Sequence, residues 1–385
     1  MAVASRDRVQ DIREARGLFP ATEDSAYLNT AAVGLASRRL ATASEQYLAD
    51  WVASGLDFVR GESAGENARA AAAGLIGADP TEVALIASVS AAAGLVAAQL
   101  GSEDPAGGSV VIGEREFSSN HFPWRMLAHR GYEVRQVPFR NGGLDPADVA
   151  AHVDRRTRLI AVSAVQTASG HRTEIPAVGE LARSVGALLF VDGAQWVGAL
   201  PVAQDLEWID VLATPDHKFL LNAGRGMGYC YVAPRARERL TPVAPGWKAG
   251  ATPFESYFGP DMHLSTTASR FDQSISWFAA VGDEAALSVF DAFGADAVYA
   301  RNVELSNLLR AALGEIGWAP VDLPDANRST IVSVPFGERD PRELLGRLKE
   351  RRIIGAARDG NLRLSIHFYN HEDDVARLVE ALREL

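Results

Sequence analysis

Short apolar runs of the strand type alternate with helix-like runs between residues 26 and 240, and this alternation restricts the fold more than any other feature. Strand–helix–strand spacing of this kind predicts an α/β fold, with a mostly parallel seven-stranded sheet sandwiched by helices. Sheets of this type bind ligands at the carboxyl ends of their strands. The predicted strands lie at 82–87, 108–113, 132–139, 158–165, 187–194, 208–214 and 228–234, with helices at 90–101, 119–131 and 175–186 among them.

The pattern changes after residue 255. Long helical stretches at 274–317 are followed by short strand runs at 329–336 and 361–367 and by a closing helix from 372. This order predicts a smaller α+β domain. We therefore expect a large domain over 26–255 and a small domain over 256–385 together with 1–25, with the Pro- and Gly-rich stretch 243–260 at the junction.

Composition excludes several classes of function. The chain has 385 residues, 47% of them hydrophobic, and a net charge of -11, so it offers no basic stripe for a nucleic acid. No run approaches the roughly 18 charge-free apolar residues of a membrane span, so we expect a soluble, cytoplasmic protein. Cys230 is the only cysteine and lies in an apolar run typical of a core strand. One thiol allows neither an intrachain disulfide nor a thiolate cluster, and we expect no metal.

Two ionisable residues follow neighbouring predicted strands. Asp192 directly follows the apolar run ALLFV, and at the end of a buried strand an ionised carboxylate is costly unless it meets a cation. Lys218 follows the next strand and His217, and a lysine attacks aldehydes once burial or a nearby cation lowers its pKa. Adjacent strand ends can direct the two side chains at one flat ring. The pair therefore predicts a pyridoxal 5'-phosphate (PLP) site, with Lys218 bound to the cofactor and Asp192 paired with its protonated ring nitrogen.

The segment VDGAQWVGALPVAQDLEWIDVLATPDHKFLLNAGRGMG, residues 191–228, resembles the cofactor segment of the class V aminotransferase family. These are fold type I PLP enzymes that include cysteine desulfurases, kynureninases and isopenicillin-epimerase-like proteins. The similarity extends from YLNTAAVG near the N-terminus to LRLSIHFYN near the C-terminus. It implies a PLP-dependent enzyme that acts as a homodimer with shared active sites.

The resemblance also implies roles for single residues. We expect cofactor contacts from Lys218, Asp192 and His217, from a helix start that holds the phosphate (Val89, Ser90 and Ala91) and from a stacking ring (Phe117). Ser163, Gln166 and Gln195 would line the pocket. Trp247 and Ile275 would reach the phosphate, Ile275 from the other subunit. A helix cap is the alternative role for Ser90, and core packing is the alternative for Phe117 and His217.

Three further residues are expected to contact the substrate. Arg363 matches the arginine that binds the substrate α-carboxylate in the family, and a guanidinium fixes a carboxylate through two parallel N–H donors. Asn29 and Thr30 would frame the entrance.

The chain departs from the family pattern in two places. Pro215 and Asp216 occupy positions where many relatives carry a phosphate-binding serine or threonine, which shifts that role toward Ser90, Trp247 and the partner subunit. The second departure is Cys230, which lies in a strand and not on a loop of the C-terminal half, so transfer of sulfur to a protein persulfide is not expected. The glycines of GRGMG also lack the spacing of a dinucleotide-binding loop.

These features favour a carbon–sulfur lyase that acts through an external aldimine and eliminates the β-substituent of an S-substituted cysteine. An aminotransferase, an epimerase and a decarboxylating deaminase of a cysteine conjugate remain alternatives. A non-catalytic PLP-fold binder is the least favoured reading, because Asp192, Lys218 and Arg363 are all present.

Overall fold

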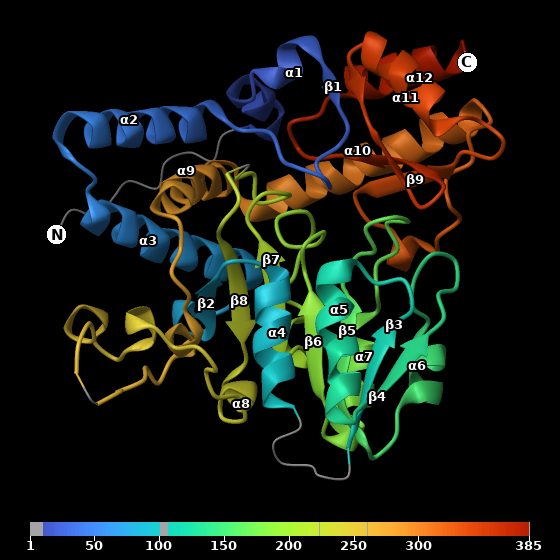
Figure 1. Cartoon of the computed structure of the whole chain (residues 1–385). Coiled ribbons are helices and arrows are strands. Elements are labelled where there is room, and N and C mark those ends of the chain that lie inside the picture. The colour runs from blue at the N-terminus through green and yellow to red at the C-terminus, as the bar shows by residue number, and fades with distance from the viewer. Residues whose placement is uncertain (1–10, 101–106, 223, 260, 385) are drawn as a thin grey trace.

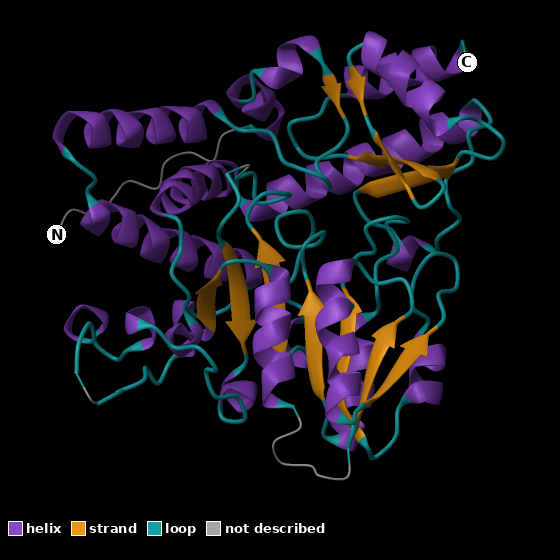
Figure 2. Ribbon diagram, viewed as in Figure 1, coloured by secondary structure: helices purple, strands orange, loops and turns teal. Residues whose placement is uncertain are grey.

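A seven-stranded sheet forms the centre of the molecule, in the order β2-β8-β7-β6-β5-β3-β4 (Figures 1 and 2). The computed structural model describes residues 11–100, 107–222, 224–259 and 261–384. Only β8 runs antiparallel to its neighbours, so the predicted mostly parallel sheet and its seven strands are confirmed. The strands are β2 (Val83–Ile86), β3 (Ser109–Gly113), β4 (Glu133–Val137), β5 (Thr157–Ser163), β6 (Leu188–Asp192), β7 (Val211–Pro215) and β8 (Gly228–Val232).

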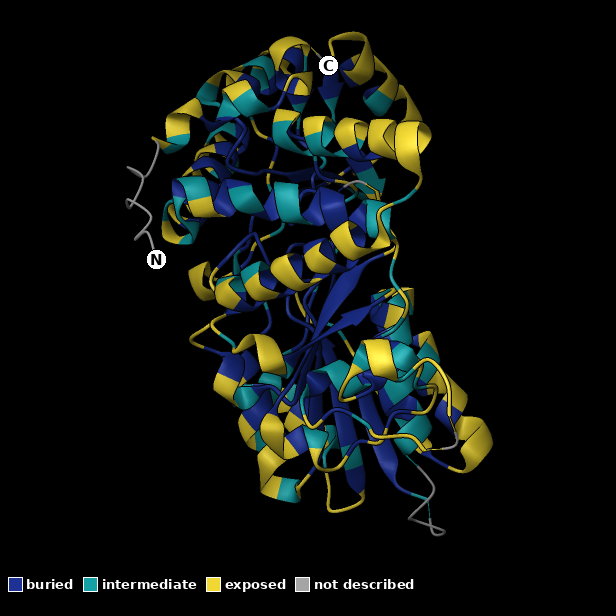
Figure 3. Ribbon diagram, turned by 90° about the vertical axis from the view of Figure 1, so that its left-hand side faces the viewer, coloured by how far each residue is buried: buried dark blue, intermediate teal, exposed yellow. Residues whose placement is uncertain are grey.

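Helices cover the sheet, and the inner strands are buried except at the half-buried Arg158 of β5 (Figure 3). Two strongly apolar strands, β6 and β7, have no exposed residue, as expected for parallel strands covered on both sides. Glycine marks the end of one covering helix: α7 is followed directly by Gly186, which adopts the left-handed conformation at a φ of 72°. The helices of this part are α2 (Arg38–Ser54), α3 (Phe58–Ile76), α4 (Val89–Gln99), α5 (Phe122–Arg125), α6 (Pro146–His152), α7 (Ile175–Val185), α8 (Pro234–Arg237) and α9 (Trp277–Phe293).

A second, smaller core lies above the carboxyl ends of the parallel strands in Figure 1. It is built on the antiparallel sheet β11-β12-β9 and on three helices. The elements are β9 (Ile331–Pro335), β10 (Ile353–Ile354), β11 (Ala356–Arg358), β12 (Asn361–Ser365), α10 (Ala295–Glu315), α11 (Pro341–Glu350) and α12 (Glu372–Arg383). Helix α10 joins the two cores, because Val298 and Tyr299 pack in the larger cluster and Leu305 and Leu309 in the smaller one. The division into 26–255 and 256–385 with 1–25 remains a prediction, and residues 1–10 lie outside the described ranges.

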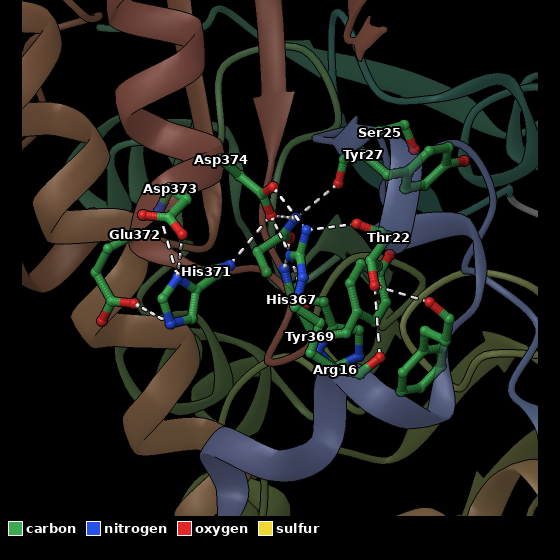
Figure 4. A network of polar contacts seen from close by, with 12 residues as sticks. Arg16, Thr22, Ser25, Tyr27, His367, Tyr369, His371, Glu372, Asp373 and Asp374 are labelled. Atoms are coloured by element: carbon green, nitrogen blue, oxygen red, sulfur yellow. Dashed lines mark hydrogen bonds and ion pairs between the residues drawn. The ribbon is translucent and has the colours of Figure 1, made fainter.

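The N-terminal segment runs beside the C-terminal one. Strand β1 (Ala26–Tyr27) pairs in parallel with β10, next to the short helix α1 (Ala21–Asp24). Figure 4 shows the polar network that supports this pairing, in which the Arg16 guanidinium donates to both carboxylate oxygens of Asp374 at 2.8 and 3.1 Å. The Asn370 amide donates to the backbone carbonyl of Tyr27 at 2.9 Å. These contacts hold residues 26–33 against the open end of the sheet, where the candidate site lies.

Short 3-10 helices connect many of these elements. The predicted helix at 119–131 is divided into Ser118–Asn120, α5 and Met126–Arg130, with Pro123 in the first turn of α5. The other 3-10 helices are Ile12–Leu18, Pro80–Glu82, Leu206–Trp208, Trp247–Ala249, Pro253–Glu255, Ala268–Phe271 and Asp325–Asn327. Among the described residues, no helix combines the length and the apolar character needed to cross a bilayer.

Candidate active site

The strand ends of β6 and β7 bring Asp192 and Lys218 into one cavity of about 270 Å³. The two strands are parallel neighbours, so their carboxyl ends lie at the same edge of the sheet. The backbone turns sharply after β7 and passes Gly34, whose N–H donates to the carbonyl of His217 at 2.9 Å. A Cβ at position 34 would lie 2.3 Å from the carbonyl oxygen of Lys218, so only glycine fits this approach. The cavity is lined by Ala31, Ala32, Val33, Ser88, Val89, Phe117, Ser119, Thr167, Asp192, Ala194, Pro215, His217, Lys218, Arg225, Arg358 and Arg363.

Burial makes the charged forms of both key residues costly. It lowers the pKa of Lys218 from 10.5 to about 8, with nearby Arg363, Arg225 and Arg358 adding to the decrease and Asp192 opposing it. Burial also raises the pKa of Asp192, and the ammonium of Lys218 partly offsets this effect. One oxygen of Asp192 accepts from the backbone N–H of Ala194 at 2.9 Å. The carboxylate therefore favours a cation in the cavity, and the lysine has an amine that is readily deprotonated.

Phe117 faces Lys218 across the cavity. The lysine Nζ lies 5.4 Å from the centre of the phenyl ring, and about half of the Phe117 side chain is exposed. The preceding residue, Glu116, is buried and was not singled out in the sequence. It accepts hydrogen bonds from the Ser163 hydroxyl, from the Ser163 N–H at 3.0 Å and from the Gln166 amide at 3.0 Å. Ser163 and Gln166 thus do not line the cavity but anchor the residue before Phe117.

The pKa of Glu116 is raised to about 7, because burial outweighs these hydrogen bonds. No local sequence signal marks this residue, since Ser163 and Gln166 lie on β5 and in the segment that follows it, and only the Asn120 amide, which donates at 3.3 Å, comes from nearby in the sequence.

Arg363 approaches the cavity from the smaller core. Its guanidinium donates to the Thr167 hydroxyl at 3.0 Å and to the Asn29 side-chain oxygen at 3.2 Å. The amide of Gln195 also donates to the Thr167 hydroxyl, at 2.9 Å. Thr167, which the sequence reasoning missed, therefore links two of the predicted residues. Thr30 is buried, contacts the Tyr369 hydroxyl and does not line the cavity.

Helix α4 begins at the edge of the same cavity. Ser88 is its N-cap and accepts from the Ala91 N–H at 3.1 Å, and both Ser88 and Val89 line the cavity. Ser90 and Ala91 are absent from the lining, although the Ser90 hydroxyl lies 3.0 Å from that of Ser88. The free N–H groups at the start of an eleven-residue helix form a site for a phosphate group.

His217 and Arg225 also line this cavity. Burial lowers the pKa of His217 to about 4, with Lys218 and Arg225 contributing, so its imidazole is neutral at pH 7. Arg225 lies in the glycine loop, at a φ of 54°, and also lines the cavity. It was not among the predicted residues, and it supplies a cation where Pro215 and Asp216 replace the usual hydroxyl. Asp216 itself is fully buried and lies outside the lining, and burial raises its pKa to about 7.

Trp247 and Ile275 lie away from Lys218 in the same chain. Trp247 lines a separate cavity of about 410 Å³ with Lys248 and Phe254. Ile275 is partly buried against the larger core, and its side chain touches α3 near Gly65. Cys230 is buried in β8, where desolvation raises its thiol pKa to about 12, and it is not part of the Lys218 cavity.

The residues present fit PLP on chemical grounds. A carboxylate, a deprotonatable amine and an aromatic ring converge on one cavity that opens onto a helix N-terminus. The buried side-chain oxygen of Gln195 has no hydrogen-bond partner among the described residues, which leaves an acceptor free close to the cavity. Fold and site together define a fold type I enzyme that uses PLP.

Comparison with known proteins identifies the family. The pattern described as Aminotransferase class-V matches residues 26–378, so the chain belongs to this family. It is 29% identical over 382 residues to the uncharacterized aminotransferase YcbU of Bacillus subtilis (strain 168), covering 95% of this chain and 96% of that protein. It is also 29% identical over 399 residues to isopenicillin N epimerase of Streptomyces clavuligerus, covering 98% and 99%.

Among solved structures, the chain resembles C-DES, described as a cystine C-S lyase. The complex of C-DES with cysteine persulfide superposes with a TM-score of 0.83 at 20% sequence identity, covering 95% of this chain and 99% of that chain. In a second C-DES structure, with a TM-score of 0.84, a glycine is covalently linked to the PLP cofactor. At this identity the likeness shows the fold, and the expected fold type is confirmed.

Proposed function

We propose that this PLP-dependent enzyme is a carbon–sulfur lyase that eliminates the β-substituent of an S-substituted cysteine. The observation that carries the proposal is a cavity equipped to bind PLP and an amino acid but without a thiol in its lining. Cys230 is buried in β8 with its thiol pKa raised to about 12, so it is neither accessible nor ionised at pH 7. Sulfur therefore leaves with its substituent as a free thiol and is not passed to the protein.

Four residues of the cavity have roles in this reaction. Arg363 would bind the α-carboxylate with the N–H groups that are not taken by Thr167 and Asn29, and its hydrogen bonds to these two residues hold the guanidinium in place. Asp192 would keep the ring nitrogen of the cofactor protonated, and Phe117 would pack on the ring. Bound PLP supplies the electron sink that makes the Cα–H and Cβ–S bonds labile. Lys218, with its pKa of about 8, takes the Cα proton.

The overall reaction balances as follows. The Cα–H bond breaks, the electron pair expels the thiolate from Cβ, and the thiolate takes up a proton. Water then hydrolyses the remaining enamine to pyruvate and ammonium. No oxidant or reductant is needed.

Arg358 supports a substrate that carries a further negative charge. It lines the cavity, adds to the burial that lowers the pKa of Arg363, and forms no ion pair with a described residue. We therefore expect S-carboxyethylcysteine to react faster than S-propylcysteine, which has a similar length and no charge.

The test is incubation of PLP-loaded enzyme with these two compounds. Thiol, pyruvate and ammonia should appear in equal amounts, and Lys218→Ala should abolish all three. Movement of the amino group to an added keto acid without thiol release would instead indicate an aminotransferase. Inversion at Cα without any product would indicate an epimerase, and carbon dioxide a decarboxylating deaminase. A protein whose cofactor absorbance does not respond to any amino acid would be a binder.

We also propose a homodimer with shared active sites. Trp247 and Ile275 lie away from the Lys218 cavity of their own chain, as expected if the stretch around Ile275 serves the partner. Large apolar side chains are exposed close to the α2–α3 turn and in the loop after Trp247, among them Val52 at 81% and Phe258 at 95%. Light scattering during gel filtration measures the mass, and a monomer at micromolar concentration would contradict the proposal.

A further inference from the structure

A cavity between the two cores is separate from the one that contains Lys218. It has a volume of about 660 Å³, and none of its lining residues belongs to the Lys218 cavity. Helix α10 forms one wall, and the segment 320–329 forms another. Arg172 and Leu200 close it from the side of the larger sheet.

Three arginines line this cavity, and one of them has no counter-ion in the part of the chain that the structure describes. Arg172 pairs with Asp205 at 3.1 Å, and Arg328 pairs with Asp325. Arg310, on α10, donates to the backbone carbonyl of Ile331 at 2.9 Å but has no carboxylate within 4 Å among the described residues.

The surroundings of Arg310 make this charge unfavourable. Its side chain is half-buried, and its Nε is fully buried without a hydrogen-bond partner in the described part of the chain. Burial and the nearby charge of Arg328 lower the pKa of Arg310 to about 10, which still leaves it charged at pH 7. Asp322 also lines the cavity, but it is exposed and forms no ion pair with a described residue. A partly buried cation beside a second cation is normally compensated by an anion.

We propose that this cavity binds a small oxyanion, a carboxylate or phosphate group, with Arg310 as its principal ligand. A guanidinium binds either group through two parallel N–H donors. The bound anion supplies the counter-charge that Arg310 lacks and also attracts Arg328 and Arg172. The proposal does not depend on the reaction catalysed at Lys218.

The position of the cavity connects the anion to the active site. Arg172 belongs to the segment after β5 that also carries Thr167, the residue that contacts Arg363. This segment is bound to the smaller core, since the Ser329 hydroxyl donates to the Gly170 carbonyl at 2.6 Å and the Asn327 amide donates to the Arg172 carbonyl at 2.9 Å. An anion in the cavity faces both the segment that carries Arg172 and the segment 320–329, and it strengthens the contact between them.

The test uses PLP-loaded enzyme, in which the cofactor already occupies the helix N-terminus that could take a free phosphate. Thermal unfolding is followed with inorganic phosphate or succinate at 0.1–30 mM, at constant ionic strength set with chloride. We expect a saturable rise in Tm with one of the two anions, and the stronger one identifies the preferred group. No saturable rise with either would overturn the proposal.

Matched variants locate the effect. Arg310→Gln removes the charge and should weaken anion binding at least tenfold, whereas Arg310→Lys keeps the charge and should stay within about fivefold of the parent. Arg347→Gln on α11 makes the same charge change at an exposed ion pair with Glu343 and should bind as the parent does. Equal binding by Arg310→Gln and the parent would place the anion elsewhere, for example at Arg363. If Arg310→Gln does not fold, Arg172→Gln takes its place with a smaller but measurable weakening, because Arg172 also pairs with Asp205, and parent-like binding by it would likewise overturn the proposal.

Discussion

The pKa of Lys218 in the cofactor-free protein is the quantity that the structure predicts most directly. Burial lowers the pKa of this lysine from 10.5 to about 8. At pH 7 its neutral fraction is then about 9%, compared with about 0.03% for a lysine that titrates at 10.5, a difference of about 300-fold. The shift corresponds to about 3 kcal/mol of differential stabilisation of the neutral amine.

Substitutions around Lys218 should move this pKa in opposite directions. Asp192 is the one neighbour that raises it, so Asp192→Asn should lower the pKa below 8. Arg363 lowers it, so Arg363→Gln should raise the pKa above 8. Because burial is the largest cause, neither variant should return Lys218 to 10.5.

The assay is competitive acetylation with acetic anhydride between pH 6 and 11. Acetylation of Lys218 is quantified by mass spectrometry, and the exposed Lys349 in the same digest supplies the reference curve. The reasoning is refuted if the parent labels with a midpoint near 10.5, or if the two variants shift the midpoint in the same direction.

Three further outcomes follow from other contacts. Glu116→Gln should reduce the pH dependence of stability: burial raises the folded-state pKa of Glu116 from 4.5 to about 7, so the parent should lose about 2–3 kcal/mol more than the variant as pH rises from 4.5 to 7, as measured by urea unfolding at pH 5 and 7.5. Arg225→Gln should weaken PLP binding to the cofactor-free protein about tenfold, and Arg225→Lys should restore part of it; an unchanged Kd in an absorbance titration would exclude a phosphate contact. Arg16→Met should cost about 1–3 kcal/mol in unfolding free energy, because it leaves the buried Asp374 carboxylate without its cation; a loss no larger than that of Arg38→Met, at an exposed ion pair, would contradict this.

Most of the fold could be predicted from local sequence patterns. Six of the seven strands of the large sheet are short, mainly apolar runs that can be recognised without knowledge of their neighbours, and the edge strand β4, with the sequence EVRQV, is the exception. The pairing of β1 with β10 could not be predicted, because two-residue strands more than 300 positions apart carry no periodicity. Their register depends on the polar network around Arg16 and Asp374, which forms only when the two ends of the chain meet.

The candidate site divides in the same way. Asp192 and Lys218 each follow an apolar strand, and adjacent parallel strands end at one edge of a sheet, so the sequence alone determined that this carboxylate and this amine would meet. Only the tertiary structure decided which other side chains surround them. Ser163 and Gln166 turn toward Glu116, and Arg225 and Arg358 enter the cavity, because side-chain direction and long-range packing depend on segments that are remote in sequence. Charge balance is likewise a property of the folded state, since only the positions of the described carboxylates show that none of them pairs with Arg310.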